Sequence, residues 1–179
     1  MKRTSRLAAG LVATAALAAP STLAAAEAAP PVKPQTKQLL KDIDGKDARL
    51  SRLATSAAVT RLADDTEVAL VARVEEARAA LAEVRAAAEA ADSTLDTRAV
   101  RKELRSFRVE NLRIVVNVLT KVDGLEEAAA TDPEAVAHLA AAEAAALAIT
   151  ATSTKADIRA ARSHLTAARG ELEAVTEAG

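Results

Sequence analysis

The 179-residue sequence contains no cysteine, no tryptophan and no tyrosine, and its single phenylalanine is Phe107. Without cysteine the chain can form no disulfide, no thiolate metal site, no cysteine nucleophile and no lipid-modified cysteine. Surfaces that stack on sugars or nucleic-acid bases need aromatic rings, and Phe107 alone supplies one. These absences argue against a disulfide scaffold, a carbohydrate platform and a base-stacking surface.

Glycine and proline are also scarce, with five residues each, whereas 49 residues are alanine. Alanine is the best helix former, and glycine and proline are the worst. No proline occurs between Pro34 and Pro133, so helices can run long over that stretch. The composition therefore predicts an all-α protein.

The N-terminus has the features of a secretory signal peptide. Three basic residues among the first six precede an apolar run over residues 7–19, and small residues follow at sites that fit cleavage after Ala26 or Ala28. Thirteen apolar residues are too few to span a bilayer, which needs about 20. Because Lys2 and Arg3 are not a twin-arginine pair, we expect the general secretion route. The prediction is a signal peptide over residues 1–26 and a secreted, extracellular product without a wall-sorting signal.

Removal of residues 1–26 leaves 21 basic and 25 acidic residues, a net charge of −4. A generally acidic, exported chain is a poor candidate for nucleic-acid binding. No later apolar stretch reaches spanning length. We therefore expect no nucleic-acid partner and no transmembrane segment in the mature chain, and the expected partner is an unknown protein or envelope component.

Residues 27–36 contain three prolines and no apolar periodicity, which predicts a proline-rich linker. From there to residue 177 the sequence predicts a single domain, an antiparallel up-down helical bundle or coiled-coil-like assembly of four to five helices. In the first helical segment, Lys46 interrupts the apolar seam. The predicted helical segments are 37–62, 65–91, 97–122, 131–149 and 155–176.

The second segment has the cleanest heptad pattern, the seam of a coiled coil that closes either within the chain or between copies of it in a homo-oligomer. Asp64 and Glu67 are spaced as a capping box that would start this helix, and a continuous helix through this point is the alternative. The seam consists of Leu70, Val74, Ala77, Leu81, Val84, Ala88, Ala91 and Leu95.

The third segment is predicted to be the central helix, because alanine disappears between Ala99 and Ala128 and large apolar residues form two adjacent stripes. Asn111 falls on one stripe, where we expect it to set the register of packing rather than to bind a ligand. Gly124 is expected to end or bend this helix. The stripes are Val100, Leu104, Phe107, Ile114 and Val118, and Leu112, Val115, Leu119 and Val122.

Local signals bound the last two segments. Asp132 or Thr131 is expected to cap the fourth helix, with Pro133 in its first turn. The hydroxyl-rich stretch 150–154 competes for backbone hydrogen bonds and should end it.

Residues suited to catalysis or metal binding are few. The sequence has two histidines, His138 and His164, and neither has a set of metal-ligating neighbours at helical spacing. No nucleophile elbow, phosphate-binding glycine loop or calcium loop is present in the sequence. We therefore expect no enzyme activity, no catalytic residues, no metal and no cofactor.

One basic stripe has two interpretations. Arg98, Arg101, Arg105 and Arg108 are spaced to share one helix face. They could bind an anion, such as a lipid headgroup, teichoic acid or an acidic partner protein. The favoured interpretation is that they pair with the acidic helix predicted over residues 65–91, because the charge blocks along the chain alternate in sign.

The preference for alanine, and for arginine over lysine, resembles exported proteins of actinobacteria with GC-rich genomes. A signal peptide followed by a small all-helical body also resembles, in outline, the secreted co-haemolysin (CAMP factor) family, a resemblance that transfers no residues. The leading hypothesis is a secreted, non-catalytic helical bundle with a structural or protein-interaction role. The alternative is a membrane-surface-active protein that binds anionic lipid through amphipathic helices.

Overall fold

The computed structural model describes residues 32–178, and this part of the chain is all α-helical with no strand. The all-α prediction is therefore confirmed. The predicted signal peptide and residues 27–31 lie outside the described residues. The helices are α1 (Val32–Ala54), α2 (Asp64–Ala90), α3 (Thr94–Ser106), α4 (Val109–Ala129), α5 (Pro133–Leu147) and α6 (Lys155–Ala178).

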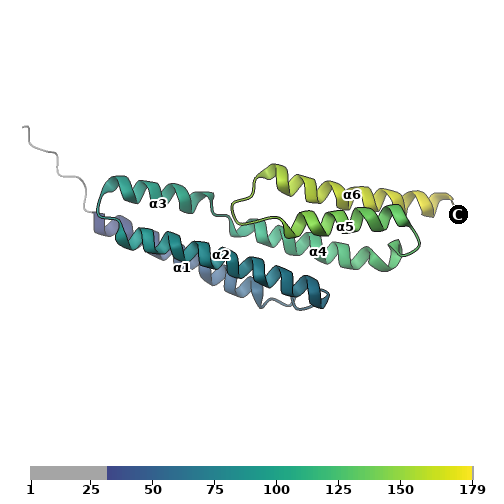
Figure 1. Ribbon diagram of the computed structural model, residues 1–179, viewed down its shortest axis with the longest axis horizontal. Coiled ribbons are helices and arrows are strands. Elements are labelled where there is room, and N and C mark those ends of the chain that lie inside the picture. Colours follow the sequence, from purple (N-terminus) through teal and green to yellow (C-terminus); the bar gives the residue numbers. More distant parts are fainter. Residues whose placement is uncertain (1–31, 179) are drawn as a thin grey trace, which may run out of the picture.

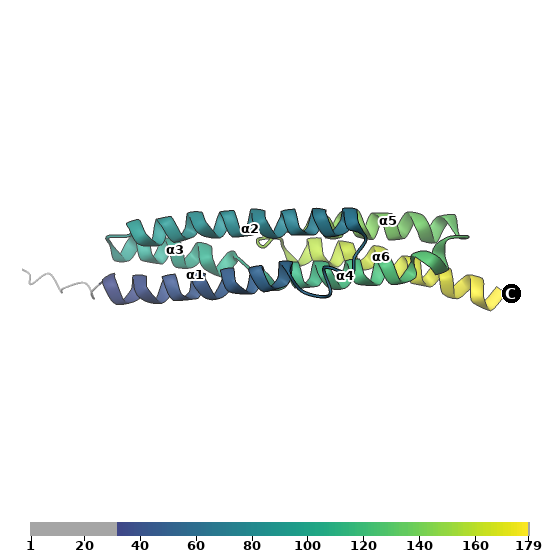
Figure 2. The same ribbon diagram turned by 90° about the horizontal axis from the view of Figure 1, so that it is seen from below.

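The helices form an elongated molecule with two sets of three helices placed along one long axis (Figures 1 and 2). The first set is α1, α2 and α3, and the second is α4, α5 and α6. α4 continues in the direction of α3 rather than turning back (Figure 1). Both α1 and α2 also contact α4, and α2 contacts α5, so the two sets share an interface.

The predicted helix over residues 97–122 is wrong in one respect, because it is divided into α3 and α4. Phe107 and Arg108 adopt extended backbone conformations, with ψ angles of 107° and 101°. Neither proline nor glycine marks this point, and partners distant in sequence bind the freed backbone groups instead. The Lys46 Nζ donates to the Phe107 carbonyl at 2.6 Å, and the Arg108 N–H donates to the Ala151 carbonyl at 2.7 Å.

The predicted apolar seams form the core. On α2 the seam is buried from Leu70 to Ala88, so this heptad face closes within the chain. Leu95, the last seam position, lies beyond the end of α2 and is 72% exposed. Both stripes of the third segment are buried except Ile114, which is half-buried. At about 1.5–3 kcal/mol for each fully buried large apolar side chain, α4 supplies a large share of the core energy.

Several predicted boundaries are corrected. α1 begins at Val32, so it includes residues 32–36, which the sequence assigned to the linker; Pro34 falls in its first turn, where proline is tolerated. α1 ends at Ala54 instead of continuing to residue 62, and turns over residues 55–63 separate it from α2, so the continuous-helix alternative is wrong. Val59 in these turns is fully buried, so this segment packs against the core although it is not helical.

Two further local predictions fail and two succeed. Asp64 does not cap α2, whose N-cap is Ala63 without a side-chain hydrogen bond. Gly124 does not end its helix, since α4 runs on to Ala129 despite the roughly 1 kcal/mol that a helical glycine costs. Asp132 caps α5 as predicted, accepting from two backbone N–H groups at 2.9 and 3.1 Å. α5 ends before the hydroxyl-rich stretch 150–154.

Candidate anion-binding groove

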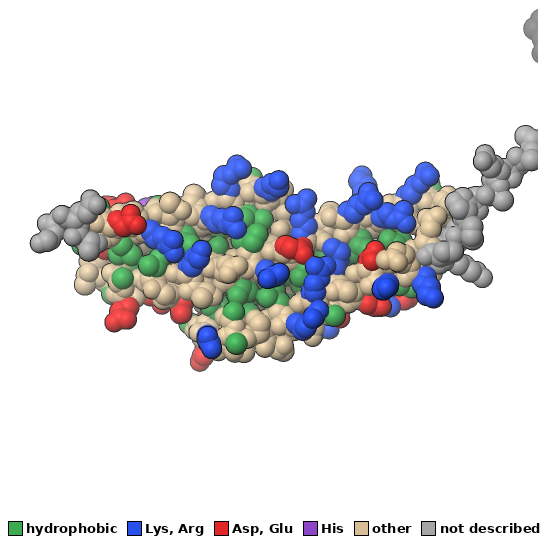
Figure 3. All heavy atoms as spheres, turned by 180° about the vertical axis from the view of Figure 1, so that it is seen from behind, with side chains coloured by type: hydrophobic (Ala, Val, Ile, Leu, Met, Phe, Trp, Pro, Cys, Tyr) green, Lys and Arg blue, Asp and Glu red, His purple; other side chains and the backbone are tan. Residues whose placement is uncertain are grey.

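Lysine and arginine side chains gather over one long face of the molecule, with few acidic side chains among them (Figure 3). Three connected hollows lie on this side, with volumes of about 670, 710 and 400 Å³. The first lies between α1 and α3, the second where α1, the α3–α4 break and α6 meet, and the third between α4 and α6. We call these three hollows together the basic groove.

Neighbouring hollows adjoin one another, because they share lining residues. Lys46 and Arg105 line both the first and the second, and Ile114 and Arg162 line both the second and the third. Four helices and the α3–α4 break contribute cations to the groove. These cations are Lys41, Lys46, Arg49, Arg101, Arg105, Arg108, Lys121, Lys155, Arg159, Arg162 and Arg169.

Three of the four arginines of the predicted stripe line this groove, and Arg98 lies outside the hollows. Arg101 is half-buried, whereas Arg98, Arg105 and Arg108 are exposed. Among residues 32–178, no ion pair involves any of the four. The favoured interpretation, pairing with the acidic second helix, is therefore wrong.

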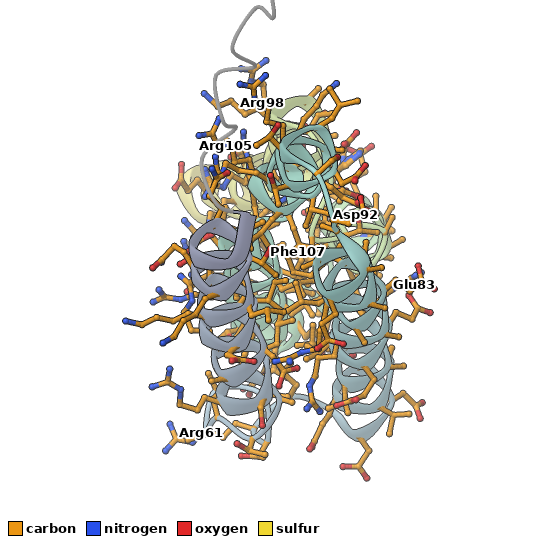
Figure 4. The ribbon with its side chains drawn as sticks, turned by 90° about the vertical axis from the view of Figure 1, so that its left-hand side faces the viewer. Arg61, Glu83, Asp92, Arg98, Arg105 and Phe107 are labelled. Atoms are coloured by element: carbon orange, nitrogen blue, oxygen red, sulfur yellow. The ribbon has the colours of Figure 1, made fainter. Side chains whose placement is uncertain are left out.

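The geometry of α2 and α3 explains why that pairing does not form. Arg98 and Arg105 point to one side of the molecule, whereas Glu83 and Asp92 lie on the other (Figure 4). The two helices touch through their apolar faces, because Leu104 and the α2 seam are buried.

Several charges of α2 are paired within the helix or with α1. Arg78 binds Asp47 of α1 at 2.9 Å and Glu75 of its own helix at 3.1 Å, and Arg85 binds Asp44 of α1. The pairs of Arg78 with Asp47 and of Arg85 with Asp44 thus join α2 to α1. Within the described part of the chain, none of the ion pairs of α2 involves a cation of α3.

Only two acidic residues line the three hollows, Asp42 and Glu110. Glu110 accepts from Arg49 Nη1 at 2.9 Å. A hydrogen bond with its own backbone N–H at the start of α4, together with the charges of Arg49 and Lys46, lowers the pKa of Glu110 and keeps it ionised. The groove therefore carries a large excess of positive charge.

Lys46, like Arg49, is a groove cation that also makes a contact within the fold. It is half-buried, and its Nζ donates to the Phe107 carbonyl and lies 6.0 Å from the centre of the Phe107 ring. Burial lowers the pKa of the Lys46 ammonium below its ordinary value of 10.5; the charge of Arg49 adds to this effect, and Glu110 and Asp42 oppose it. Lys46 thus binds α1 to the break between α3 and α4.

This lowered pKa predicts a dependence of stability on pH. Between the folded-state pKa of Lys46 and 10.5, the unfolded chain binds more protons than the folded chain, so stability should rise with pH over that window. We expect Lys46→Gln, which keeps a hydrogen-bond donor but does not titrate, to remove this rise. Urea unfolding of both proteins from neutral pH to pH 10.5 measures the difference, and an identical pH dependence in the two would contradict the assignment.

Asn111 also lines the second hollow, but its side-chain nitrogen donates to backbone carbonyls of the protein itself. Its side chain is 3% exposed, and its Nδ2 donates to the carbonyls of Ser153 at 3.0 Å, Thr150 at 3.1 Å and Ala151 at 3.4 Å. These bonds tie the start of α4 to the connection between α5 and α6. The side-chain nitrogen of Asn111 therefore already has backbone acceptors. The position of Asn111 on the apolar seam did not predict these hydrogen bonds.

The two histidines come together across the contact between α5 and α6, with ring centres 6.3 Å apart. The sequence did not predict this approach, since 25 intervening residues separate His138 from His164. Over residues 32–178, no group of three or more His, Asp or Glu residues is placed to hold a metal ion. In the same range no helix combines the length and apolar character needed to cross a membrane.

The groove offers positive charge and many N–H donors over an apolar floor. Arginine guanidinium groups can bind carboxylates or phosphates through two parallel hydrogen bonds. Ile114 and Ile158 are half-buried beneath these cations in the second hollow.

No protein-family model matches the chain, and comparisons with curated proteins and with solved structures find no match.

Proposed function

We propose that this chain is an exported, non-catalytic helical protein that binds a negatively charged protein or envelope component through the basic groove. One observation carries the proposal: eleven cations and two acidic residues line three connected hollows. Structural arginines normally acquire acidic partners, as Arg78 and Arg85 do here. Among residues 32–178, Arg49 is the one groove arginine with an ion pair, to Glu110, and the others are available to an external anion.

The strength of such binding depends on the number of contacts. One exposed ion pair contributes about 0.2–1 kcal/mol, so a useful affinity needs several at once. A groove holds cations around the ligand on more than one side and concentrates their field. Affinity should fall as salt rises, because the Debye length is only about 8 Å at physiological ionic strength.

Membrane-surface activity is the second candidate, motivated by the same cations. Insertion into lipid also requires apolar side chains that are free to enter it. In the described chain the large exposed hydrophobic residues are scattered over α2, α3, α5 and α6, as Val68, Leu95, Val136 and Val175. This distribution favours a groove ligand over a bilayer surface.

A double charge reversal tests the proposal. We expect Arg101→Glu/Arg105→Glu to weaken binding of the mature chain to poly-L-glutamate and polyphosphate by at least about tenfold. A tenfold loss of affinity corresponds to about 1.4 kcal/mol, which two charge reversals together can supply. Arg61→Glu/Arg113→Glu changes the net charge equally at exposed residues that line none of the groove hollows, and should change binding little. Titration at low and physiological salt measures both.

The outcomes separate the candidates. Equal losses in the two double variants would show that net charge and not the groove governs binding, and would refute the proposal. Sedimentation with anionic and neutral vesicles tests the second candidate. Co-sedimentation with anionic vesicles that persists at physiological salt, with a change in helical circular dichroism, would favour membrane activity instead.

A further inference from the structure

We infer that the partner held in the basic groove is an acidic segment of another protein, with carboxylates against the cationic walls and apolar side chains on the floor. This inference rests on the proposed function and specifies its ligand. Three properties of the groove carry it: its length, the placement of its charges and its apolar floor.

The groove is long and follows the chain. Its hollows succeed one another from Arg101 on α3 to Lys121 on α4, a path of about 30 Å at 1.5 Å per residue. That length accommodates about 20 residues of a helix or about nine residues of extended chain. A peptide segment can therefore contact all three hollows at once, which a small anion cannot do.

The charges line both sides of this path. α1 contributes cations such as Lys41 beside the first hollow, and α6 contributes Arg159 and Arg169 beside the second and third. A flat lipid surface can contact these charges from one direction only. A linear ligand that lies inside the groove can pair with cations on both walls.

The floor distinguishes a protein segment from other linear anions. In the second hollow, Ile114 and Ile158 are half-buried while Arg105 and Arg108 beside them are exposed. Covering this apolar surface is favourable by about 25 cal/mol per Å². A phosphate polymer has no apolar group to place there, whereas a peptide with leucines among its glutamates has both kinds of side chain in one chain.

The test compares two 20-residue synthetic peptides of equal negative charge. One carries Glu with Leu at helical spacing, and the other has Ser in place of every Leu. We expect the Glu/Leu peptide to bind the mature chain at least about tenfold more tightly than the Glu/Ser peptide at physiological salt, since its leucines cover the floor. Fluorescence anisotropy of labelled peptides gives both affinities.

Variants locate the effect. Ile158→Ala, which keeps a good helix former, should reduce the advantage of the Glu/Leu peptide to about threefold or less and leave Glu/Ser binding unchanged. Val175→Ala, at a 59%-exposed position on the same helix, is the matched control and should preserve the advantage. Circular dichroism melting shows whether each variant is folded, and Ile158→Val replaces Ile158→Ala if the latter unfolds.

Each outcome has a separate meaning. Equal affinities for the two peptides would overturn this inference and leave the proposed function standing. Polyphosphate that binds more tightly than the Glu/Leu peptide would identify a phosphate polymer as the ligand and also overturn it. Failure of both peptides and polyphosphate to bind would refute the proposed function itself. Self-association in sedimentation velocity that Arg101→Glu/Arg105→Glu abolishes would show a second copy of the chain as the occupant and overturn the inference of another protein.

Discussion

Replacement of Leu112 by alanine is expected to lower the free energy of unfolding by about 2–5 kcal/mol. Leu112 has no exposed surface and lies on α4, the helix that contacts α1, α2, α5 and α6. Removing a buried isobutyl group loses its transfer free energy and leaves a cavity that the neighbouring side chains fill only in part. Because small proteins are stable by about 5–15 kcal/mol, this single change removes a large fraction of the total.

Urea unfolding followed by helical circular dichroism measures this loss, since the chain has neither Trp nor Tyr to report by fluorescence. Leu95→Ala is the matched control, because Leu95 is 72% exposed on α3 and its truncation should cost less than about 0.5 kcal/mol. A loss below about 1 kcal/mol for Leu112→Ala would contradict the central position of α4.

Asn111→Ala should lower the free energy of unfolding by about 1–3 kcal/mol, because it removes the hydrogen bonds of a buried side-chain amide, including the one to the Ser153 carbonyl. The Asn111 side chain donates to the carbonyls of Thr150, Ala151 and Ser153, and the first two also accept from the N–H groups of Ser153 and Arg108. These residues have no regular helix to satisfy them, since α5 has ended and α6 has not begun. We also expect Asn111→Ala to speed amide hydrogen exchange more in this connection than in the helices beside it.

Asn117→Ala supplies the control for this prediction. Asn117 is exposed on the same helix, so its replacement should change stability by less than about 0.5 kcal/mol. Urea unfolding gives the two free energies, and hydrogen exchange followed by mass spectrometry reports on residues 148–154. Equal effects of the two substitutions would show that the connection does not depend on Asn111.

Local signals predicted much of the helical structure. The heptad of α2 predicted its buried residues from Leu70 to Ala88, and Asp132 with Pro133 predicted the start of α5. These features follow from interactions within about four residues, which the sequence displays directly. Ser93 and Asp96 form a capping box at the start of α3, three residues before the predicted start at residue 97.

The division between α3 and α4 had no such signal. Residues 106–108 are Ser, Phe and Arg, none of which breaks a helix by itself. The break persists because Lys46, 61 residues earlier, and Ala151, on the connection between α5 and α6, bind the backbone groups that it frees. Periodicity across this region continues on both sides, so a pattern of apolar spacing could not reveal it.

The candidate site was predicted in part. Helical spacing placed Arg101, Arg105 and Arg108 on one face, and the structure puts all three beside the groove. The other wall comes from cations on α1 and α6 that no local pattern connected with them, such as Lys41 and Arg159. Charge alternation along the chain predicted the wrong partner for the stripe, because it does not say toward which side of a helix pair each charge points.

The sequence by itself determined that this protein is helical, which residues form its apolar seams and where α5 and α6 begin. Those properties depend on propensity, on the 3.6-residue repeat and on capping groups, all of which act over a few residues. Only the tertiary structure decided that α4 follows α3 in the same direction, that Asn111 and Lys46 bind distant backbone carbonyls, and that cations from four helices line one groove. The Asn111 and Lys46 hydrogen bonds join residues 39 and 61 positions apart, and the groove joins residues even farther apart, so no local pattern encodes these contacts.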